Sequence, residues 1–210
     1  MDTSQESLAG KVCLVPGATS GIGKVTAREL ARRGATVVIV GRSEARSAAT
    51  VSQIRQQTAN PSVDFLLADL SSQQEVRRLA GEFEGRYPRL DVLVNNAGVY
   101  GPLGMIDEVE WEEWKRAIEI NLYGTACPSR IIFKHFRKRR YGKIVNLSGG
   151  GATSPLPRIS AYAASKAAIV RLTETLALEG LDYNIDVNAV APGALNTRLM
   201  TSLLDAGPEK

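Results

Sequence analysis

The sequence contains few of the residues that bind metal ions or build hydrolytic triads. Its 210 residues include one histidine, His135, and two cysteines, Cys13 and Cys127, which lie far apart. One imidazole and two separated thiols are a poor basis for a four-ligand zinc site, so we expect no metal. A Ser-His-Asp triad would have to use His135, which stands near the expected end of a helix in "FKHFRKRR". The sequence therefore argues against classical hydrolase chemistry, and two free thiols favour a cytoplasmic location.

Long hydrophobic runs are also missing. The longest apolar stretches, such as "TVVIV" at 36–40, are far too short to cross a bilayer. The first residues, "MDTSQESLAG", have neither the basic start nor the apolar run of a secretion signal. We expect no membrane partner, and we predict a disordered tail over residues 1–8.

The net charge of +4 includes one dense basic cluster, "KHFRKRR" at 134–140. Such a cluster is compatible with a nucleic-acid surface, or with a solvated helix C-terminus, where cations complement the helix dipole. No second basic stripe accompanies it. We interpret the cluster as a helix end and expect no nucleic-acid partner.

Short apolar segments alternate with segments of helical periodicity. Strands that are apolar throughout, separated by amphipathic helices, indicate a parallel sheet covered on both faces. The pattern predicts an α/β fold, a three-layer doubly wound parallel sheet (Rossmann fold), as a single domain over 1–210. Pro128 should kink or split the longest helix. Six strands are predicted at 12–15, 35–41, 62–70, 91–98, 142–149 and 185–193, and helices at 22–33, 44–58, 72–86, 108–138 and 160–180.

A glycine-rich turn follows the first predicted strand. In "VCLVPGATSGIG", Gly17, Gly21 and Gly23 have the spacing G-x-x-x-G-x-G. Glycines permit a tight turn and the close approach of a pyrophosphate, whose charge the N–H groups of a helix start can meet. Alone such a turn is a weak signal, but its position between a strand and a helix indicates a dinucleotide site.

The end of the second predicted strand carries information about the dinucleotide. An acidic residue at this point serves the ribose of NAD, and a basic one serves the extra phosphate of NADP. In "VVIVGRSEAR", Arg42 holds the position, and a guanidinium can form paired hydrogen bonds to a phosphate. A solvated arginine at a loop start is the alternative. We predict NADP in preference to NAD.

Tyr162 and Lys166 stand four residues apart on a predicted helix, so they share a face. An ammonium near a phenol favours the phenolate and should lower its pKa. Such a tyrosine can exchange a proton with an alcohol/carbonyl pair while hydride moves to or from a nicotinamide. This spacing is common by chance. The pair indicates a catalytic site because a predicted strand and a Ser/Gly loop come directly before it.

With "NNAG" at 95–98 and "YAASK" at 162–166, the sequence resembles the classical short-chain dehydrogenase/reductase family. The resemblance extends from about Leu8 to about Leu199. It implies catalytic roles for Tyr162, Lys166, Ser148 and Asn121, with the tyrosine as general acid/base and the serine polarising the substrate carbonyl. The cofactor-binding residues that it implies are Gly17, Ser20, Gly21, Ile22, Gly23, Arg42, Asp69, Leu70, Asn95, Ala97, Gly98, Tyr162, Lys166, Pro192, Gly193 and Thr197.

Three departures from the family pattern bear on this site. Pro16 replaces the usual threonine before the cofactor loop and removes a local brace. The family serine stands thirteen residues before the tyrosine, which is Gly149 here, whereas Ser148 is fourteen before. We predict that one extra loop residue lets Ser148 act, with its hydroxyl facing that of Tyr162; loss of the serine role is the alternative. The chain also ends where the family continues with a further helix and a seventh strand, so we expect a C-terminally truncated domain.

The leading prediction is an NADP(H)-dependent oxidoreductase that acts on a small secondary alcohol or carbonyl compound. The alternatives are a catalytically impaired dinucleotide-binding fragment or regulatory protein, and an epimerase that uses the nicotinamide transiently. The resemblance also implies a homodimer through the two long helices, 108–136 and 160–180, and the shortened C-terminus argues against a tetramer.

Overall fold

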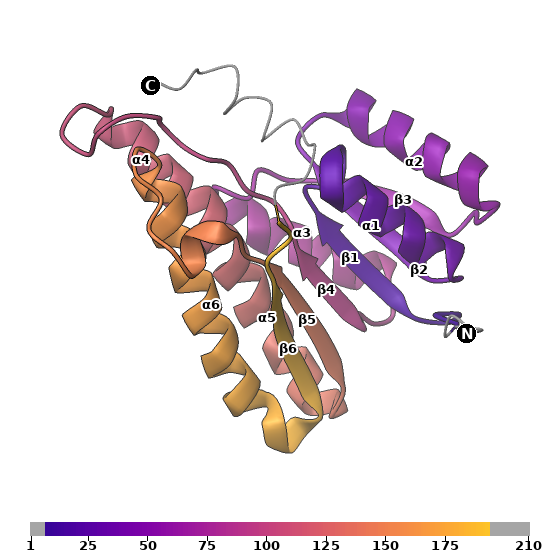
Figure 1. The fold of residues 1–210 in the computed structure, drawn as a ribbon. Coiled ribbons are helices and arrows are strands. Elements are labelled where there is room, and N and C mark those ends of the chain that lie inside the picture. The colour runs from indigo at the N-terminus through magenta and orange to yellow at the C-terminus, as the bar shows by residue number, and fades with distance from the viewer. Residues whose placement is uncertain (1–6, 194–210) are drawn as a thin grey trace, which may run out of the picture.

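A six-stranded, fully parallel sheet forms the centre of the computed structural model, which describes residues 7–193 (Figure 1). The strands lie in the order β3-β2-β1-β4-β5-β6. The chain therefore winds outward from β1 in one direction and then restarts at β4 in the other. The strands are β1 (Val12–Pro16), β2 (Thr36–Gly41), β3 (Val63–Leu67), β4 (Val92–Asn95), β5 (Gly142–Leu147) and β6 (Ile185–Val190).

Helices cover both faces of the sheet, which explains why the central strands are apolar throughout. All five residues of β1 are buried, and so are the four central residues of β2. One apolar core packs α1 and α2 against the sheet, and the other packs α3, α5 and part of α6 against it. The helices are α1 (Gly21–Arg32), α2 (Glu44–Thr58), α3 (Gln73–Arg86), α4 (Trp111–Ile118), α5 (Gly124–Arg139) and α6 (Ser160–Gly180), with short 3₁₀ turns at η2 (Gly150–Ala152) and η3 (Leu181–Tyr183). The predicted fold class and strand number are confirmed.

The predicted long helix at 108–138 is divided by a π-helical turn, η1 (Glu119–Tyr123), between α4 and α5. The division comes before the proline rather than at it, because α5 begins at Gly124 and runs through Pro128. Pro128 has no N–H, so it cannot donate the helical hydrogen bond to the carbonyl of Gly124. The turn therefore ends one helical turn before the proline, and it carries Asn121.

Leu8, the last residue of the predicted N-terminal tail, lies within the described residues. Leu8 packs against the core that contains α1, and its amide donates a hydrogen bond to the carbonyl of Arg33 at 2.8 Å. Residues 1–6 lie outside the described residues, as does the C-terminal segment from 194 on.

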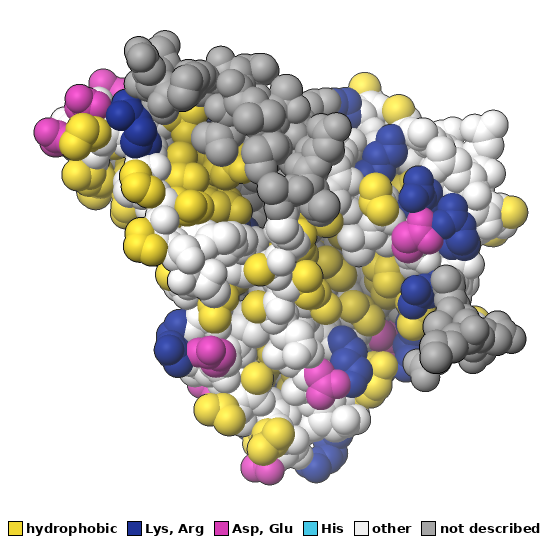
Figure 2. Space-filling model, viewed as in Figure 1, with side chains coloured by type: hydrophobic (Ala, Val, Ile, Leu, Met, Phe, Trp, Pro, Cys, Tyr) yellow, Lys and Arg dark blue, Asp and Glu magenta, His cyan; other side chains and the backbone are white. Residues whose placement is uncertain are grey.

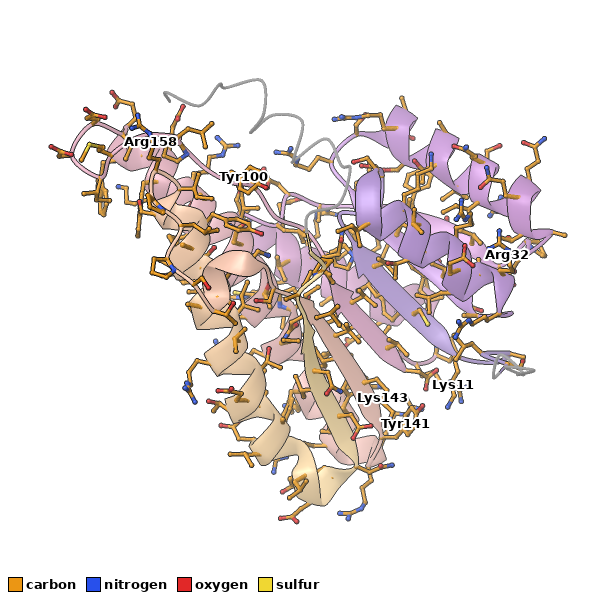
Figure 3. The ribbon with its side chains drawn as sticks, in the orientation of Figure 1. Lys11, Arg32, Tyr100, Tyr141, Lys143 and Arg158 are labelled. Atoms are coloured by element: carbon orange, nitrogen blue, oxygen red, sulfur yellow. The ribbon has the colours of Figure 1, made fainter. Side chains whose placement is uncertain are left out.

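The carboxyl ends of all six strands meet at one edge of the sheet, because every pair is parallel. In Figure 3, Tyr100 lies at this edge, after β4, whereas Lys11 and Tyr141 mark the opposite edge, where β1 and β5 begin. The winding direction reverses between β1 and β4, and in doubly wound folds ligands bind in the crevice at such a point.

The described helices do not include one that is long and apolar enough to cross a membrane. On the face seen in Figure 2, Lys and Arg side chains are interspersed with acidic ones.

Candidate functional site

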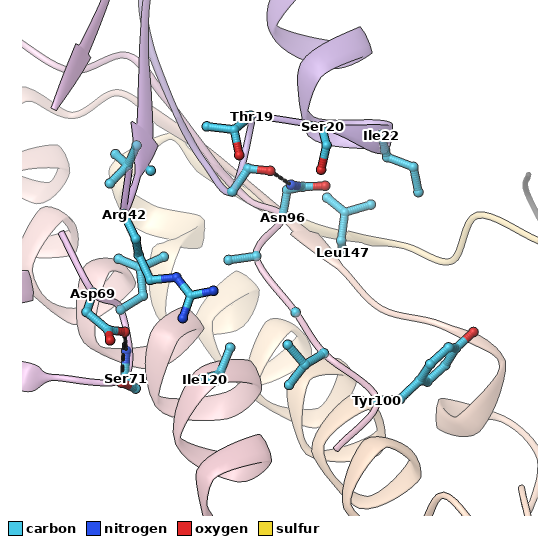
Figure 4. A pocket seen from close by; sticks show the side chains of 18 of the residues that line it. Thr19, Ser20, Ile22, Arg42, Asp69, Ser71, Asn96, Tyr100, Ile120 and Leu147 are labelled. Atoms are coloured by element: carbon cyan, nitrogen blue, oxygen red, sulfur yellow. Dashed lines mark hydrogen bonds between the residues drawn. The ribbon is translucent and has the colours of Figure 1, made fainter. Parts of the chain in front are cut away.

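A cavity of about 460 Å³ opens at the carboxyl ends of the strands, where the winding reverses. Its walls come from the segments after β1 to β6, from η1 and from the first part of α6. Arg42 extends its guanidinium into this space from the β2 side, and Tyr100 lies at the other end (Figure 4). One cavity therefore joins the predicted dinucleotide end to the predicted catalytic end.

The turn after β1 needs glycine at two positions. Gly17 has φ +71°, and a Cβ built there would lie 2.8 Å from the Cα of Ala97. A Cβ at Gly23 would overlap the side-chain nitrogen of Asn96 and lie 2.8 Å from the carbonyl oxygen of Gly17. The backbone here forms a narrow cradle beside the start of α1, a geometry that fits a pyrophosphate.

Asn96, which was not predicted as a site residue, locks this turn. Its side-chain amide donates to the carbonyl oxygens of Pro16 at 3.2 Å and Gly17 at 3.0 Å. The Gly17 amide in turn donates to the Val40 carbonyl at 2.9 Å. These bonds hold the loop that begins with Pro16, so a second brace is present where the family threonine is missing. In the sequence, the second asparagine of "NNAG" was the feature that could have identified Asn96 as a site residue.

The β2 end of the cavity is basic. Arg42 follows β2, and Ser43 caps α2 by accepting a hydrogen bond from the amide of Arg46 at 3.5 Å. All three residues line the cavity. Arg42 was predicted as a site residue but Arg46 was not; its position in the first turn of α2, four residues after Arg42, was a usable signal.

Asp69 lies across from Arg42, in the loop after β3. Burial alone would raise the pKa of the Asp69 carboxyl, but two hydrogen bonds from Ser71 and the positive charge of Arg42 together hold it below its ordinary value. Its Oδ1 accepts from the Ser71 amide at 3.0 Å and hydroxyl at 2.8 Å. The carboxylate is therefore ionised and fixed at the cavity wall (Figure 4).

Tyr162 and Lys166 lie on the cavity side of α6, as their spacing predicted. The Tyr162 ring is 8% exposed and meets the Tyr100 ring edge-on, with centroids 4.8 Å apart. Burial raises the pKa of Tyr162 above its ordinary value, and Tyr100 adds to the rise. The predicted lowering of this pKa is thus wrong.

Lys166 is bonded to the carboxyl end of β5. Lys166 Nζ donates to the carbonyl of Leu147 at 2.7 Å and stands 5.7 Å from the centroid of the Tyr162 ring. Burial lowers the pKa of Lys166 from 10.5 to about 8. Gly98 provides the room for it, since a Cβ there would lie 3.4 Å from Nζ.

Asn121 is held by three hydrogen bonds and does not line the cavity. Its Oδ1 accepts from the Val99 amide at 2.8 Å, and its Nδ2 donates to the Val99 carbonyl at 2.9 Å and to Ser165 Oγ at 2.9 Å. The side chain therefore joins the loop after β4 to α6. Its contacts place it beside α6, the helix that carries Tyr162 and Lys166, at the π-helical turn.

Ser148 is buried and turned toward α6. Its hydroxyl donates to the carbonyl of Lys166 at 3.4 Å, and its amide donates to the Val190 carbonyl at 2.9 Å. Between 7 and 193, no hydrogen bond joins this hydroxyl to Tyr162. The arrangement expected for Ser148, hydroxyl to hydroxyl with Tyr162, is not found.

The remaining predicted residues divide into three groups. Asn95 lies inside the sheet, where its Nδ2 donates to Ser129 Oγ at 3.0 Å and Asn146 Oδ1 at 2.8 Å. Gly21 has φ +55° and open space around it but does not line the cavity, and Thr197 lies outside the described residues. The others line the cavity, namely Ser20, Ile22, Leu70, Ala97, Pro192 and Gly193.

The described residues contain no group of three or more His, Cys, Asp or Glu side chains that could hold a metal ion. Taken together, the fold and site define a nucleotide-binding α/β protein with a buried tyrosine–lysine pair at one end of its cavity.

Comparison with known proteins gives the family. A family model described as short chain dehydrogenase matches residues 11–207. A 3beta-hydroxysteroid dehydrogenase of Mediterraneibacter gnavus is 38% identical over 189 residues, which are 90% of this chain and 67% of that protein. The 11-beta-hydroxysteroid dehydrogenase A of Sesamum indicum is 38% identical over 195 residues, 92% of this chain and 55% of its own length.

Among solved structures, a gluconate 5-dehydrogenase of Burkholderia cenocepacia in complex with NADP and tartrate matches with a TM-score of 0.88 and 33% identity. The match covers 95% of this chain and 77% of that one. The chain belongs to the short-chain dehydrogenase family, and it is an oxidoreductase like these three dehydrogenases. It spans between about half and three quarters of their length.

Proposed function

We propose that the chain is an NADP(H)-dependent oxidoreductase that interconverts a small secondary alcohol and its carbonyl compound. The observation that carries the proposal is the single cavity that links Arg42 and the glycine turn to Tyr162 and Lys166. A solved relative that holds NADP supports the same assignment.

The chain's own residues have clear tasks toward the dinucleotide. The turn between Gly17 and Gly23 receives the pyrophosphate, while Arg42 and Arg46 neutralise the additional phosphate that distinguishes NADP from NAD. The fixed carboxylate of Asp69 and the neighbouring Leu70 meet the adenine. When bound, the nicotinamide supplies or accepts the hydride.

Tyr162 supplies the proton. Because its pKa is raised, the phenol is protonated at neutral pH and can donate to a carbonyl oxygen as that oxygen gains charge. Lys166 is held by its hydrogen bond to the Leu147 carbonyl, and its ammonium can also donate to the ribose hydroxyls and to Tyr162. Asn121 keeps the loop after β4 and α6 in register, and so positions the pair.

The test is turnover of NADPH, followed by its absorbance, with a panel of ketones and aldehydes. Tyr162→Phe should lower kcat by about 10²–10⁴-fold, since it removes the proton donor. NADPH affinity, measured by fluorescence, should change little. Tyr183→Phe, in η3 at the far end of α6, is the matched control and should keep wild-type kcat. Equal activity of the two variants would refute the role of Tyr162.

The NADP preference has its own test. Arg42→Ala should weaken NADPH binding by about 10–100-fold, because a charge-assisted hydrogen bond to phosphate is worth about 1.5–3 kcal/mol. NADH binding should change much less. Arg130→Ala, at an exposed position of α5, is the control for loss of charge alone. If NADH binds the wild-type chain as tightly as NADPH does, the preference is wrong.

A non-catalytic dinucleotide-binding protein is the second candidate. The contact of Ser148 with Lys166, instead of with Tyr162, favours it. Tight NADPH binding without turnover of any carbonyl would support this candidate. An epimerase would regenerate NADPH, so product analysis under limiting cofactor separates it from the oxidoreductase.

We also propose a cytoplasmic homodimer through α4–α5 and α6. Exposed apolar side chains on this part of the chain support it, among them Tyr123 in η1 and Leu178 in α6. The unpaired Cys13 and Cys127 support a reducing compartment. Light scattering should give the dimer mass, and a monomer or tetramer would contradict it.

A further inference from the structure

The main chain at Gly149 lies directly against the hydroxyl end of Tyr162. A Cβ built at this position would overlap the Tyr162 hydroxyl oxygen and would lie 3.0 Å from Cζ and 3.4 Å from Cε1. Gly149 has φ 179° and ψ 176°, which is extended backbone that any residue can adopt. Glycine is therefore required here by space and not by conformation.

Ser148 lines the cavity, but its hydroxyl is bonded away from Tyr162. Its amide is bonded to Val190 on β6, its hydroxyl is bonded to Lys166 on α6, and the residue is 4% exposed. Successive residues of an extended chain point to opposite sides. The side that faces Tyr162 belongs to Gly149, and this side carries no hydroxyl.

Tyr100 also contacts the Tyr162 ring. The two rings meet edge-on with centroids 4.8 Å apart, and Tyr100 is part of the cavity wall. The Tyr162 side chain thus contacts both an aromatic ring and a glycine backbone. Neither neighbour places a serine or threonine hydroxyl opposite the phenol.

We propose that Gly149 is a specificity-determining residue: within residues 7–193, the position that faces the Tyr162 hydroxyl carries no second side-chain hydroxyl, so that the site favours activated carbonyl compounds. Ser148 is then a positioning residue for Lys166. This inference rests on the proposed oxidoreductase function.

The substrate class follows from the chemistry of reduction. The carbonyl carbon gains a hydride while the oxygen gains charge and takes the Tyr162 proton, and each aligned donor lowers that barrier. Loss of one such donor costs about 10²–10³-fold in kcat where it has been measured. A carbonyl beside an electron-withdrawing group, as in an α-dicarbonyl compound, needs less polarisation than a simple ketone. An aldehyde is likewise more electrophilic.

The experiment compares butane-2,3-dione with butan-2-one in wild type and three variants, with NADPH affinity measured for each. Ser148→Ala should lower kcat for the dione by less than ten-fold. Gly149→Ala and Gly149→Ser both add the Cβ that displaces the phenol, but only serine adds a hydroxyl. Relative to Gly149→Ala, we expect Gly149→Ser to raise kcat/KM for butan-2-one at least ten-fold and for the dione much less.

Two results would overturn the proposal. One is a loss of 100-fold or more in Ser148→Ala at unchanged NADPH affinity, which would make Ser148 the polarising donor. The other is equal behaviour of the two Gly149 variants with butan-2-one. A crystal structure of the NADPH complex gives a readout that does not depend on activity: we expect Ser148 Oγ to remain on the Lys166 carbonyl, and a bond from it to Tyr162 Oη contradicts the proposal.

Failure of the proposed function itself looks different. In that case NADPH is bound, but neither carbonyl compound is reduced by the wild-type chain or by any variant. The crystal structure then still decides whether Gly149, and not Ser148, faces Tyr162.

Discussion

Asn121 and Val99 are joined by two hydrogen bonds, one to each backbone group of Val99. The Val99 amide donates to Asn121 Oδ1 at 2.8 Å, and Asn121 Nδ2 donates to the Val99 carbonyl at 2.9 Å. Because Val99 follows "NNAG" directly, this pair ties the loop that forms one cavity wall to the π-helical turn.

Replacement of Asn121 by alanine should therefore lower the free energy of unfolding. It leaves two backbone groups of Val99 and the Ser165 hydroxyl without this partner, and an unsatisfied buried group costs about 1–3 kcal/mol. We expect a loss of at least about 2 kcal/mol in urea denaturation. Asn188→Ala, at an exposed site on β6, is the control. Equal midpoints for the two variants would show that the pair does not stabilise the fold.

The buried lysine predicts a particular pH dependence of stability. The pKa of Lys166 is about 8 in the folded chain, against 10.5 as its ordinary value. Between these values the unfolded chain binds more protons, so folding is favoured increasingly as the pH rises. Below about pH 8 both states are protonated, and this contribution is absent.

Wild type should accordingly gain about 3 kcal/mol relative to Lys166→Met between pH 8 and 10.5. Denaturant melts of both chains across this range measure the difference, which also removes effects of other titrating groups. Lys138→Met, at an exposed position of α5, is the control for removal of a lysine. Parallel curves for wild type and Lys166→Met would mean that the lysine titrates normally.

Two glycines offer a matched test of the cofactor cradle. Gly17→Ala puts a Cβ at 2.8 Å from the Ala97 backbone at a positive φ, so it should destabilise the chain by more than about 1 kcal/mol and abolish NADPH binding. Gly85→Ala, in α3 with no neighbour within 4 Å, should stabilise it by about 0.5–1 kcal/mol. Calorimetry and fluorescence titration measure both quantities. Unchanged NADPH affinity in Gly17→Ala would refute the cradle.

A buried polar chain links the sheet to α6. Asn146 accepts from Asn95 and donates to Thr173 Oγ1, each at 2.8 Å. Thr173→Val keeps the shape but removes the acceptor of the Asn146 amide, which should cost about 1–3 kcal/mol.

Thr175→Val is the matched control for this variant. Thr173 and Thr175 both donate to the carbonyl four residues earlier in the same helix, but only Thr173 is buried against Asn146. The control should stay within about 0.5 kcal/mol of wild type. If the two valine variants have the same melting temperature, the hydrogen bond to Asn146 contributes nothing to the free energy of unfolding.

Much of the site was predictable because its parts are local in sequence. The four-residue spacing places Tyr162 and Lys166 on one helix face, and the glycine turn stands directly between β1 and α1. Parallel strands bring such loops to one edge without further information. The position of Arg42 at the end of β2 likewise predicts that it lines the same cavity.

Other features depend on contacts between distant segments, and sequence reasoning missed them or got them wrong. Asn96 reaches back 79 and 80 residues to brace the turn at Pro16 and Gly17. The direction of the Tyr162 pKa shift depends first on burial and then on Tyr100, which comes from a distant segment of the chain. Spacing within one segment carries no information about such pairings.

Hydrophobic periodicity and the order of the motifs thus determine the fold class, the family and the edge of the sheet where the cavity opens. The tertiary structure alone decides which backbone faces Tyr162. One residue of register separates Ser148 from Gly149, and consecutive residues of an extended chain point to opposite sides. The bonds of Ser148 to Val190 and Lys166, two contacts with other elements of the fold, set this register and place Gly149 against the phenol.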